Sequence, residues 1–349
     1  MATQTGITIA GPNEPYTVVD NIPRPTCGPT QALVKSLFVG LNPVEPFMQH
    51  TGVLIAEFPA VIGSDVSGVV LEVGSECKKL EKGEYVFGCV PVGLNKFSPF
   101  QETFLAEEDW TFKKGERVGL EEACTVGAGV LTAGLALIDG QGLKVPAPGT
   151  NAEQKDSWVI VMGGSGSVGQ YACQIAKLCG YKVLASCSPS KDEIARKAGA
   201  TATFNNRAPI DEQLGLIERI TGGQFGRIFD ASVQAVQLSI KALEAISKES
   251  DKYFASADDW SEMDVPDSIS VYRVQLGLLG RADNPLSKRV TDQVAEMVRI
   301  FEGQIEAGGL RPLDYELAPG MGWDKVIEGI ANLEAGKAIK KSVVKVQEE

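Results

Sequence analysis

The chain has 349 residues, 44% of them hydrophobic, which is enough for two domains that each bury a core of their own. Its formal net charge is −12, from 45 acidic and 33 basic residues. Because no basic cluster interrupts this acidic balance, contact with the phosphate backbone of a nucleic acid is unfavourable. We therefore expect no nucleic-acid partner.

Segments that would direct the chain to a membrane are absent from the sequence. No apolar stretch approaches the ~20 residues of a membrane span, and residues 1–11 lack the basic and then apolar layout of a signal peptide. We expect a cytoplasmic protein without membrane association. The seven cysteines have no paired short spacing, so we expect most to be small buried hydrophobic residues rather than disulfides.

The N-terminal third consists of short β-type runs separated by Gly and Pro, at 32–39, 65–73, 85–90 and 100–106. This pattern predicts a compact and mostly antiparallel β unit.

From about Glu121 onward, the pattern changes. The apolar run 158–162 shows no alternation, which is typical of a parallel strand buried on both faces, and the helix 168–179 follows it after a glycine turn. Strand and helix candidates then alternate, which predicts a doubly wound parallel sheet. They lie at 182–186, 191–198, 202–204, 211–221, 227–230 and 233–246.

The C-terminal part continues this mixed pattern. We expect exposed loops at 140–156 and 251–267, helices at 287–306 and 323–335, and a β-branched strand at 341–346 that returns to the N-terminal β unit. Trp323 and Trp260 are expected to be packing residues.

The pattern G-x-G-x-x-G lies directly between the buried strand and the amphipathic helix. Its first glycine makes the tight turn, its second lets a pyrophosphate approach, and its third lets helix and strand pack closely. The positive end of the helix dipole would face the phosphates. We therefore predict dinucleotide binding at Gly164, Ser165, Gly166, Ser167, Val168 and Gly169.

The next strand ends in Ser188, Pro189, Ser190 and Lys191, where a site that prefers NAD normally has a carboxylate for the ribose 2′-hydroxyl. The two serines and the lysine can hydrogen-bond to a 2′-phosphate and neutralise it, which favours NADP(H). In a second interpretation, the serines only cap the helix that follows. Both interpretations can hold together.

Motifs along nearly the whole chain resemble zinc-free medium-chain dehydrogenases/reductases of the quinone oxidoreductase type. The similarity is greatest to fungal trans-acting enoyl reductases, which serve polyketide synthases. The motifs include 40–45 (GLNPVE), 63–70 (GSDVSGVV), 82–88 (KGEYVFG), the glycine turn, 187–190 (CSPS) and 204–209 (FNNRAP).

The resemblance implies an α/β fold with two domains. A GroES-like β-rich domain would comprise 1–125 and 300–349, and a Rossmann domain with a doubly wound parallel sheet would comprise 126–299. It further implies hydride transfer from NADPH to a small-molecule or carrier-bound substrate, with a polyketide synthase as a candidate partner. Both a monomer and a homodimer fit.

Carried over by position, the resemblance adds further site residues. It places the cofactor also against Val44, Glu45, Pro46, Phe47, Asn206, Ala338 and Ile339. It places the substrate along Leu131, Thr132, Ala133, Gly134 and Leu135, and near Leu276, Gly277 and Leu278.

The chain departs from its zinc-dependent relatives at the metal ligands. Those relatives have a Cys near position 42 and a His-Glu pair after Gly63, whereas this chain has Asn42 and Ser64-Asp65, and its single histidine is His50. We therefore expect no metal. Without a Lewis acid, reduction of a conjugated C=C bond is favoured over alcohol oxidation.

The catalytic residue stays unknown at this stage. The tyrosine that donates a proton in some enoyl reductases is absent, and Asn206 replaces a stacking tyrosine of many relatives. A general quinone or enone reductase and a non-redox protein on the same scaffold are therefore alternatives.

Three further polar positions have two interpretations each. His50 is either an acid in the site or a solvated side chain. Glu45 either orients the substrate or a ribose hydroxyl, or is a surface carboxylate. The pair Lys340-Lys341 either faces the cofactor or is solvated at an edge strand.

Overall fold

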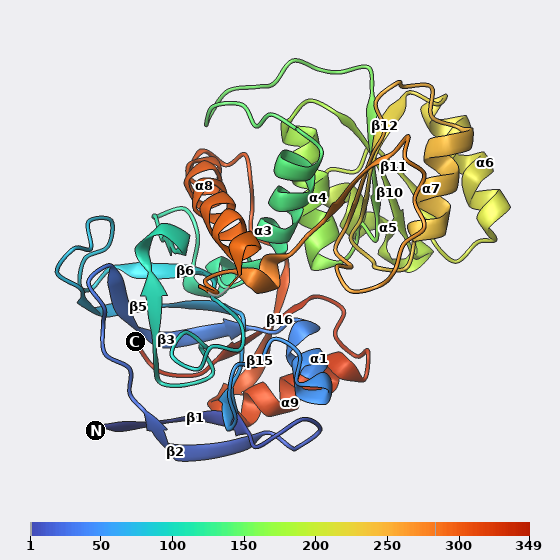
Figure 1. The fold of residues 1–349 in the computed structure, drawn as a ribbon. Coiled ribbons are helices and arrows are strands. Elements are labelled where there is room, and N and C mark those ends of the chain that lie inside the picture. The colour runs from blue at the N-terminus through green and yellow to red at the C-terminus, as the bar shows by residue number, and fades with distance from the viewer. Residues whose placement is uncertain (1, 283) are drawn as a thin grey trace. The chain divides into compact units, whose positions relative to one another are not determined.

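A computed structural model describes residues 2–282 and 284–349, and within it the chain separates into two compact units (Figure 1). Unit 1 comprises Met1–Ala128, Gly277–Glu302 and Pro312–Glu349. Unit 2 comprises Gly129–Leu276 and Gly303–Arg311. The stretch Gly277–Glu302 lies in the unit of the N-terminal residues, whereas the division expected from the sequence placed 277–299 with the dinucleotide-binding part.

Unit 1 is built on β-structure. A mainly antiparallel sheet has the order β15-β16-β3-β5-β6-β8, with β7 paired to β3, and a small sheet has the order β2-β1-β4. The strands are β1 Thr3–Ile9, β2 Thr17–Pro23, β3 Gln31–Gly40, β4 Ala60–Val61, β5 Asp65–Val73, β6 Tyr85–Cys89, β7 Thr103–Glu107, β8 Phe112–Lys113, β15 Tyr315–Met321 and β16 Lys341–Lys345. The expected antiparallel β unit is confirmed, as is the return of the last strand, because β16 pairs with β3.

The helices of unit 1 are short, apart from those near the C-terminus. They are α1 Val44–Thr51, η1 Glu108–Trp110, α2 Leu120–Ala123, η4 Leu276–Leu278 at the unit boundary, α8 Pro285–Ala307, whose last residues belong to unit 2, and α9 Trp323–Glu334. Trp323 is 9% exposed and packs in the core with Val326 and Val344, which confirms it as a packing residue.

Unit 2 contains a six-stranded parallel sheet with the order β11-β10-β9-β12-β13-β14. Its strands are β9 Trp158–Met162, β10 Lys182–Cys187, β11 Ala202–Asn205, β12 Phe225–Asp230, β13 Tyr253–Ser256 and β14 Ser270–Arg273. Its helices are α3 Ala128–Gly134, the π-helix η2 Leu135–Gly140, α4 Ser167–Leu178, η3 Pro189–Lys191, α5 Asp192–Lys197, α6 Ile210–Thr221 and α7 Val236–Ala245. The predicted doubly wound sheet is confirmed.

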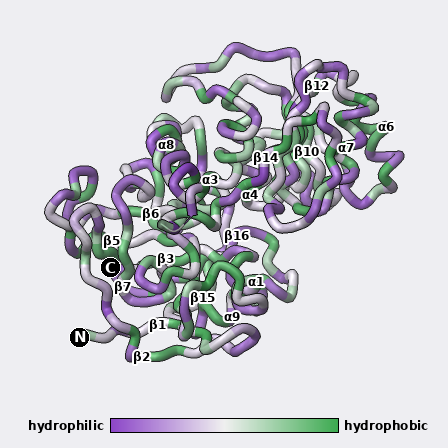
Figure 2. Tube along the Cα trace, in the orientation of Figure 1, coloured by the Kyte–Doolittle hydropathy of each residue, from purple (hydrophilic) through white to green (hydrophobic). Residues whose placement is uncertain are grey.

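Hydrophobic residues concentrate on the strands inside the sheet of unit 2 (Figure 2). Ile160, Leu184 and Ile228 on its three central strands are completely buried. Parallel strands covered on both faces have no polar face, which explains why these segments show no alternation in the sequence.

The expectation of an exposed loop at 251–267 is wrong for its first part. Tyr253–Ser256 forms β13, which pairs with β12, and Phe254 is completely buried. The surrounding acidic residues concealed this four-residue strand, and tertiary packing decides such short segments. Trp260 is 61% exposed, so the expectation that it packs in the interior is also wrong.

The cysteines behave as expected. All seven are free, and Cys89, Cys124, Cys173, Cys179 and Cys187 are buried. Among the residues that the structure describes, no helix combines the length and apolar composition of a membrane span.

Candidate functional site

In unit 2, the predicted glycine turn joins the carboxyl end of β9 to the start of α4. Gly163 has a φ of 78°, in the left-handed region that favours glycine. The Gly163 N–H donates to Ser186 Oγ at 2.9 Å, and the Gly164 N–H donates to Ser186 O at 2.8 Å, which fastens the turn to the neighbouring strand β10. The turn therefore has a fixed conformation against the sheet.

The three glycines of the motif differ in whether packing requires a glycine at that position. A Cβ at Gly164 would lie 2.6 Å from Ala185 Cβ, and one at Gly169 would collide with the Gly163 carbonyl. These two glycines are therefore required by packing within unit 2. At Gly166, in contrast, the nearest protein atom would be Gly163 O at 3.5 Å, and φ is −75°.

Neither backbone conformation nor protein packing requires glycine at position 166. The space beside it lies at the N-terminus of α4, where the first amides of a helix have no intrahelical partner and bind anions. A Cβ atom would reduce the space available to a phosphate there. The residues of the turn thus fit a dinucleotide pyrophosphate.

The carboxyl ends of β10 and β11 bring two predicted cofactor segments together. The Asn206 N–H donates to Cys187 O at 3.1 Å, so exposed Asn206 lies beside the segment that begins at Ser188. Pro189 and Ser190 are exposed, and Lys191 is half-buried.

The capping interpretation of the serines is not what the structure shows, because Ser188 makes no side-chain cap and its Oγ lies 3.3 Å from Ser190 Oγ. The neighbouring carboxylate of Asp192 accepts a hydrogen bond from Arg196 Nε at 2.7 Å and also contacts Thr203. This acidic group is thereby engaged within its own helix and the adjacent strand.

A further segment of unit 2 borders the glycine turn and was missed from the sequence. A Cβ at Gly163 would lie 2.9 Å from Ser232 Cβ, and Val233 has a φ of 56°. The buried Asp230 carboxylate accepts hydrogen bonds from Ser232 Oγ at 2.6 Å and the Ala235 N–H at 2.8 Å, which shapes this loop. The order of the sheet reverses between β9 and β12, and ligands of such sheets bind at that point. The sequence did contain a signal for this loop, because the buried strand at 227–230 ends in the segment 229–233 (FDASV), which carries Asp230 and Ser232.

In unit 1, the segment 44–47 forms the first turn of α1. Val44 and Phe47 are half-buried, whereas Glu45 is completely buried, so its interpretation as a surface carboxylate is wrong. Its carboxylate accepts hydrogen bonds from the Asn42 N–H at 2.6 Å and Ser64 Oγ at 2.5 Å. Burial raises the pKa of Glu45 to about 7, against the lowering effect of Ser64 and the Lys341 charge.

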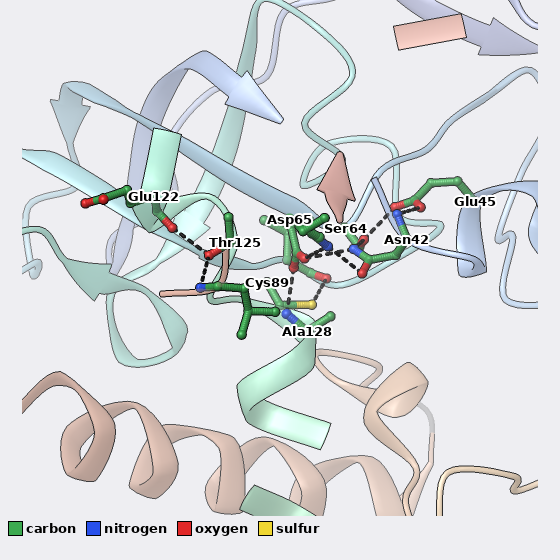
Figure 3. A network of polar contacts seen from close by, with 11 residues as sticks. Asn42, Glu45, Ser64, Asp65, Cys89, Glu122, Thr125 and Ala128 are labelled. Atoms are coloured by element: carbon green, nitrogen blue, oxygen red, sulfur yellow. Dashed lines mark hydrogen bonds and ion pairs between the residues drawn. The ribbon is translucent and has the colours of Figure 1, made fainter. Parts of the chain in front are cut away.

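Asn42, Ser64 and Asp65 point toward one another beside Glu45 (Figure 3). Asn42 Nδ2 donates to Ser64 Oγ and to Asp65 Oδ2, each at 2.8 Å. Lys341 Nζ donates to Asn42 Oδ1 and Asp65 Oδ2, each at 2.6 Å, and only 2% of the lysine side chain is exposed. The other Asp65 oxygen accepts the Ala128 N–H at 2.6 Å. We call Asn42, Glu45, Ser64, Asp65 and Lys341 the buried polar cluster.

The side chains of this cluster do not fit a metal ion. The Lys341 ammonium lies between Asn42 and Asp65. Zinc requires thiolate, imidazole or carboxylate ligands, and a buried ammonium repels a dication. In the part of the chain that the structure describes, no group of three or more His, Cys, Asp or Glu could hold a metal.

Lys340 and Lys341 behave differently. Lys340 is exposed, but Lys341 is buried on a strand that lies between β15 and β3 rather than at an edge, so the expectation of a solvated lysine pair is wrong for Lys341. His50 is half-exposed and contacts Asn13 and Glu334. Ala338 and Ile339 lie in the loop before β16, with Ile339 68% exposed.

The residues expected to contact the substrate differ in exposure. Leu131, Ala133, Gly134 and Leu135 are buried within α3 and the start of η2, and Thr132 is half-buried. Leu276, Gly277 and Leu278 form η4 and are half-buried. Their assignment to a substrate stays a prediction, as does that of the cofactor residues.

Comparison with known proteins identifies a family model and two similar relatives. The family model for the alcohol dehydrogenase GroES-like domain matches residues 28–179. The trans-enoyl reductase TOXD of Cochliobolus carbonum is 30% identical over 263 residues, covering 74% of this chain and 85% of that protein. The trans-enoyl reductase caaB of Aspergillus niger is 28% identical over 358 residues, covering 94% and 92%.

Among solved structures, mycobacterial Rv1454c in complex with NADPH has a similar fold. Its TM-score is 0.71 at 20% sequence identity, with 98% of this chain and 99% of that chain covered. The likeness extends over both units and confirms the expected α/β architecture.

Proposed function

The chain belongs to the medium-chain dehydrogenases/reductases of the trans-enoyl reductase type, and we propose that it reduces a conjugated C=C bond with NADPH. The substrate is an enoyl thioester or a related α,β-unsaturated carbonyl compound of secondary metabolism. Because the curated relatives are trans-enoyl reductases, we propose that the acyl chain is delivered on the carrier domain of a polyketide synthase.

The observation that carries the proposal is the unfilled position at Gly166. Packing accounts for the glycines at 164 and 169, whereas a Cβ at Gly166 would meet its nearest protein atom only at 3.5 Å, which leaves room for a group from outside the chain. A pyrophosphate at the N-terminus of α4 is that group. The loop at Ser232–Val233, next to Gly163, is a further cofactor contact in this proposal.

The preference for NADPH rests on the segment 188–191. Ser188 and Ser190 offer hydroxyl groups and Lys191 a positive charge for the 2′-phosphate, while the Asp192 carboxylate is occupied by Arg196 and Thr203. The NADPH complex of the structurally similar mycobacterial protein is consistent with this choice.

NADPH, when bound, supplies a hydride, which the β-carbon of the conjugated substrate accepts, and the α-carbon is then protonated. The chain's own residues bind and orient the reactants. We propose that Val44 and Phe47 on α1 and the loop at 338–339 face the nicotinamide half. The polar cluster beside them binds no metal, so the enzyme is independent of zinc.

Purified protein would be incubated with NADPH and a panel of enoyl thioesters, both free and carrier-bound. Oxidation of NADPH would be followed by the loss of the absorbance of its reduced nicotinamide ring. We expect oxidation with enoyl thioesters and a saturated product. Activity on soluble quinones alone would favour the general quinone reductase. Absence of both NADPH binding and oxidation would refute the proposal.

A further inference from the structure

We propose that the Lys341 ammonium takes the place of a catalytic metal in unit 1. It would be a positioning residue that holds the start of α1, residues 42–47, in the conformation that receives the nicotinamide half of the cofactor. This inference rests on the proposed function, because it assumes that NADPH binds the segment 44–47.

The contacts of Lys341 resemble those of a bound cation. Its Nζ lies 2.6 Å from both Asn42 Oδ1 and Asp65 Oδ2, oxygens supplied by two segments 23 positions apart, and it reaches them from a third segment near the C-terminus. Asp65 is completely buried, so its negative charge requires a partner. The lysine supplies the positive charge that a metal would otherwise supply at this point.

The surrounding backbone is shaped to admit this pair. A Cβ at Gly40 would lie 2.7 Å from the Cys124 carbonyl oxygen, 3.0 Å from Lys341 Cε and 3.1 Å from Asp65 Cβ, and one at Gly127 would collide with the Asp65 carboxylate. Gly40 thus leaves room for both side chains of the pair, and Gly127 leaves room for the Asp65 carboxylate.

Hydrogen bonds of Asn42 connect Lys341 to the start of α1. The Asn42 amide side chain is held at one end by Lys341 and at the other by Ser64 and Asp65. The Asn42 N–H in turn donates to the Glu45 carboxylate within the first turn of α1. A shift of Asn42 therefore changes the start of the helix that carries Val44 and Phe47.

The experiment compares cofactor affinities of full-length variants. Lys341→Gln keeps two amide donors but removes the charge, and the double variant Asp65→Asn with Lys341→Met removes both charges together. The control is Lys345→Gln on the same strand, whose exposed amino group pairs with Glu348. Dissociation constants for NADPH and for 2′,5′-ADP, which has no nicotinamide half, would be measured by titration calorimetry after circular dichroism has verified folding.

We expect the NADPH dissociation constant to rise at least tenfold in both variants, with the value for 2′,5′-ADP within twofold of that of the wild type. The control should match the wild type for both ligands. A role in stability alone would lower the melting temperature without this split between the two ligands.

Two results would overturn the inference, and they are distinguishable. If the wild type binds NADPH and a folded variant binds it within twofold as tightly, Lys341 does not position the cofactor segment, while the proposed function stands. If the wild type binds neither NADPH nor 2′,5′-ADP, the proposed function fails, and the inference fails with it.

Discussion

Lys341 Nζ and Asp65 Oδ2 lie 2.6 Å apart, although the two residues are separated by 276 positions in the sequence. Both side chains are almost completely buried, at 2% and 0% exposure. Removing one partner of a buried ion pair leaves an unpaired charge, which costs far more free energy than replacing both partners. Several consequences of this pair and of the glycine turn can be measured.

Lys341→Met should lower the free energy of unfolding by roughly 3 to 5 kcal/mol, because it leaves the Asp65 carboxylate buried without its cation. The double variant Asp65→Asn with Lys341→Met should regain a substantial part of that loss. Urea denaturation of the wild type, both single variants and the double variant gives the coupling energy. Additive losses in the double variant would contradict a paired role.

Glu45 should make stability depend on pH near neutrality. Its pKa is about 7 in the folded state, above the ordinary value of 4.5, so between these pH values the folded state binds more protons than the unfolded state. The contribution of Glu45 to the free energy of unfolding is therefore greatest below pH 4.5. This contribution falls by roughly 3 kcal/mol as the pH rises through 7.

The free energy of unfolding of the Glu45→Gln variant, measured between about pH 5 and 8, should depend less on pH than that of the wild type. This range includes the pKa of Glu45 in the folded state. The exposed Glu116→Gln serves as the control. An unchanged slope in Glu45→Gln would show that this carboxyl does not titrate in that range.

The glycine turn predicts opposite results for two alanine variants. Gly166→Ala should fold with nearly the stability of the wild type, because its φ of −75° suits alanine and the nearest atom to the added Cβ is 3.5 Å away. It should nevertheless weaken NADPH binding about tenfold or more, an effect of roughly 1.4 kcal/mol. Fluorescence titration and thermal melts would separate affinity from stability.

Gly169→Ala should instead lose roughly 1 to 3 kcal/mol of stability, because its Cβ would collide with the Gly163 carbonyl. If Gly166→Ala binds NADPH as tightly as the wild type does, the space beside this residue is not used by the cofactor.

Lys191→Ala and Ser188→Ala should weaken binding of NADPH more than binding of NADH, because only NADPH carries the 2′-phosphate. Added salt should reduce the NADPH preference of the wild type, since it screens the charge of the half-buried Lys191. Lys182→Ala, at the opposite end of β10 and paired with Asp156, is the matched control. Equal losses for both nucleotides would argue against a phosphate contact.

Turnover should be insensitive to removal of metal ions. Dialysis against a strong chelator should leave kcat and the melting temperature within experimental error, because the cluster of Asn42, Asp65 and Lys341 uses an ammonium in place of a dication. Restoration of lost activity by added zinc would contradict this view of the cluster.

Local patterns predicted much of unit 2. The run 158–162 matches β9 at both ends, and the glycine motif lies between strand and helix as expected. These features are encoded by residues next to one another, because a buried strand and a tight turn each impose their own residue types. The strand at 253–256 was concealed for the same reason, since its neighbours in sequence are polar and only its neighbours in the sheet bury it.

The sequence by itself therefore determined the glycine turn, the alternation of strands and helices from 158 to 246, and the presence of Asn42, Ser64 and Asp65 in place of the usual zinc ligands. Only the tertiary structure decided that Glu45 is buried and that Lys341, rather than its exposed neighbour Lys340, lies among those positions. The physical reason is that the direction of a side chain on β16 depends on the register in which this strand pairs with β3. That register joins residues about 300 positions apart, and no pattern within either segment records it.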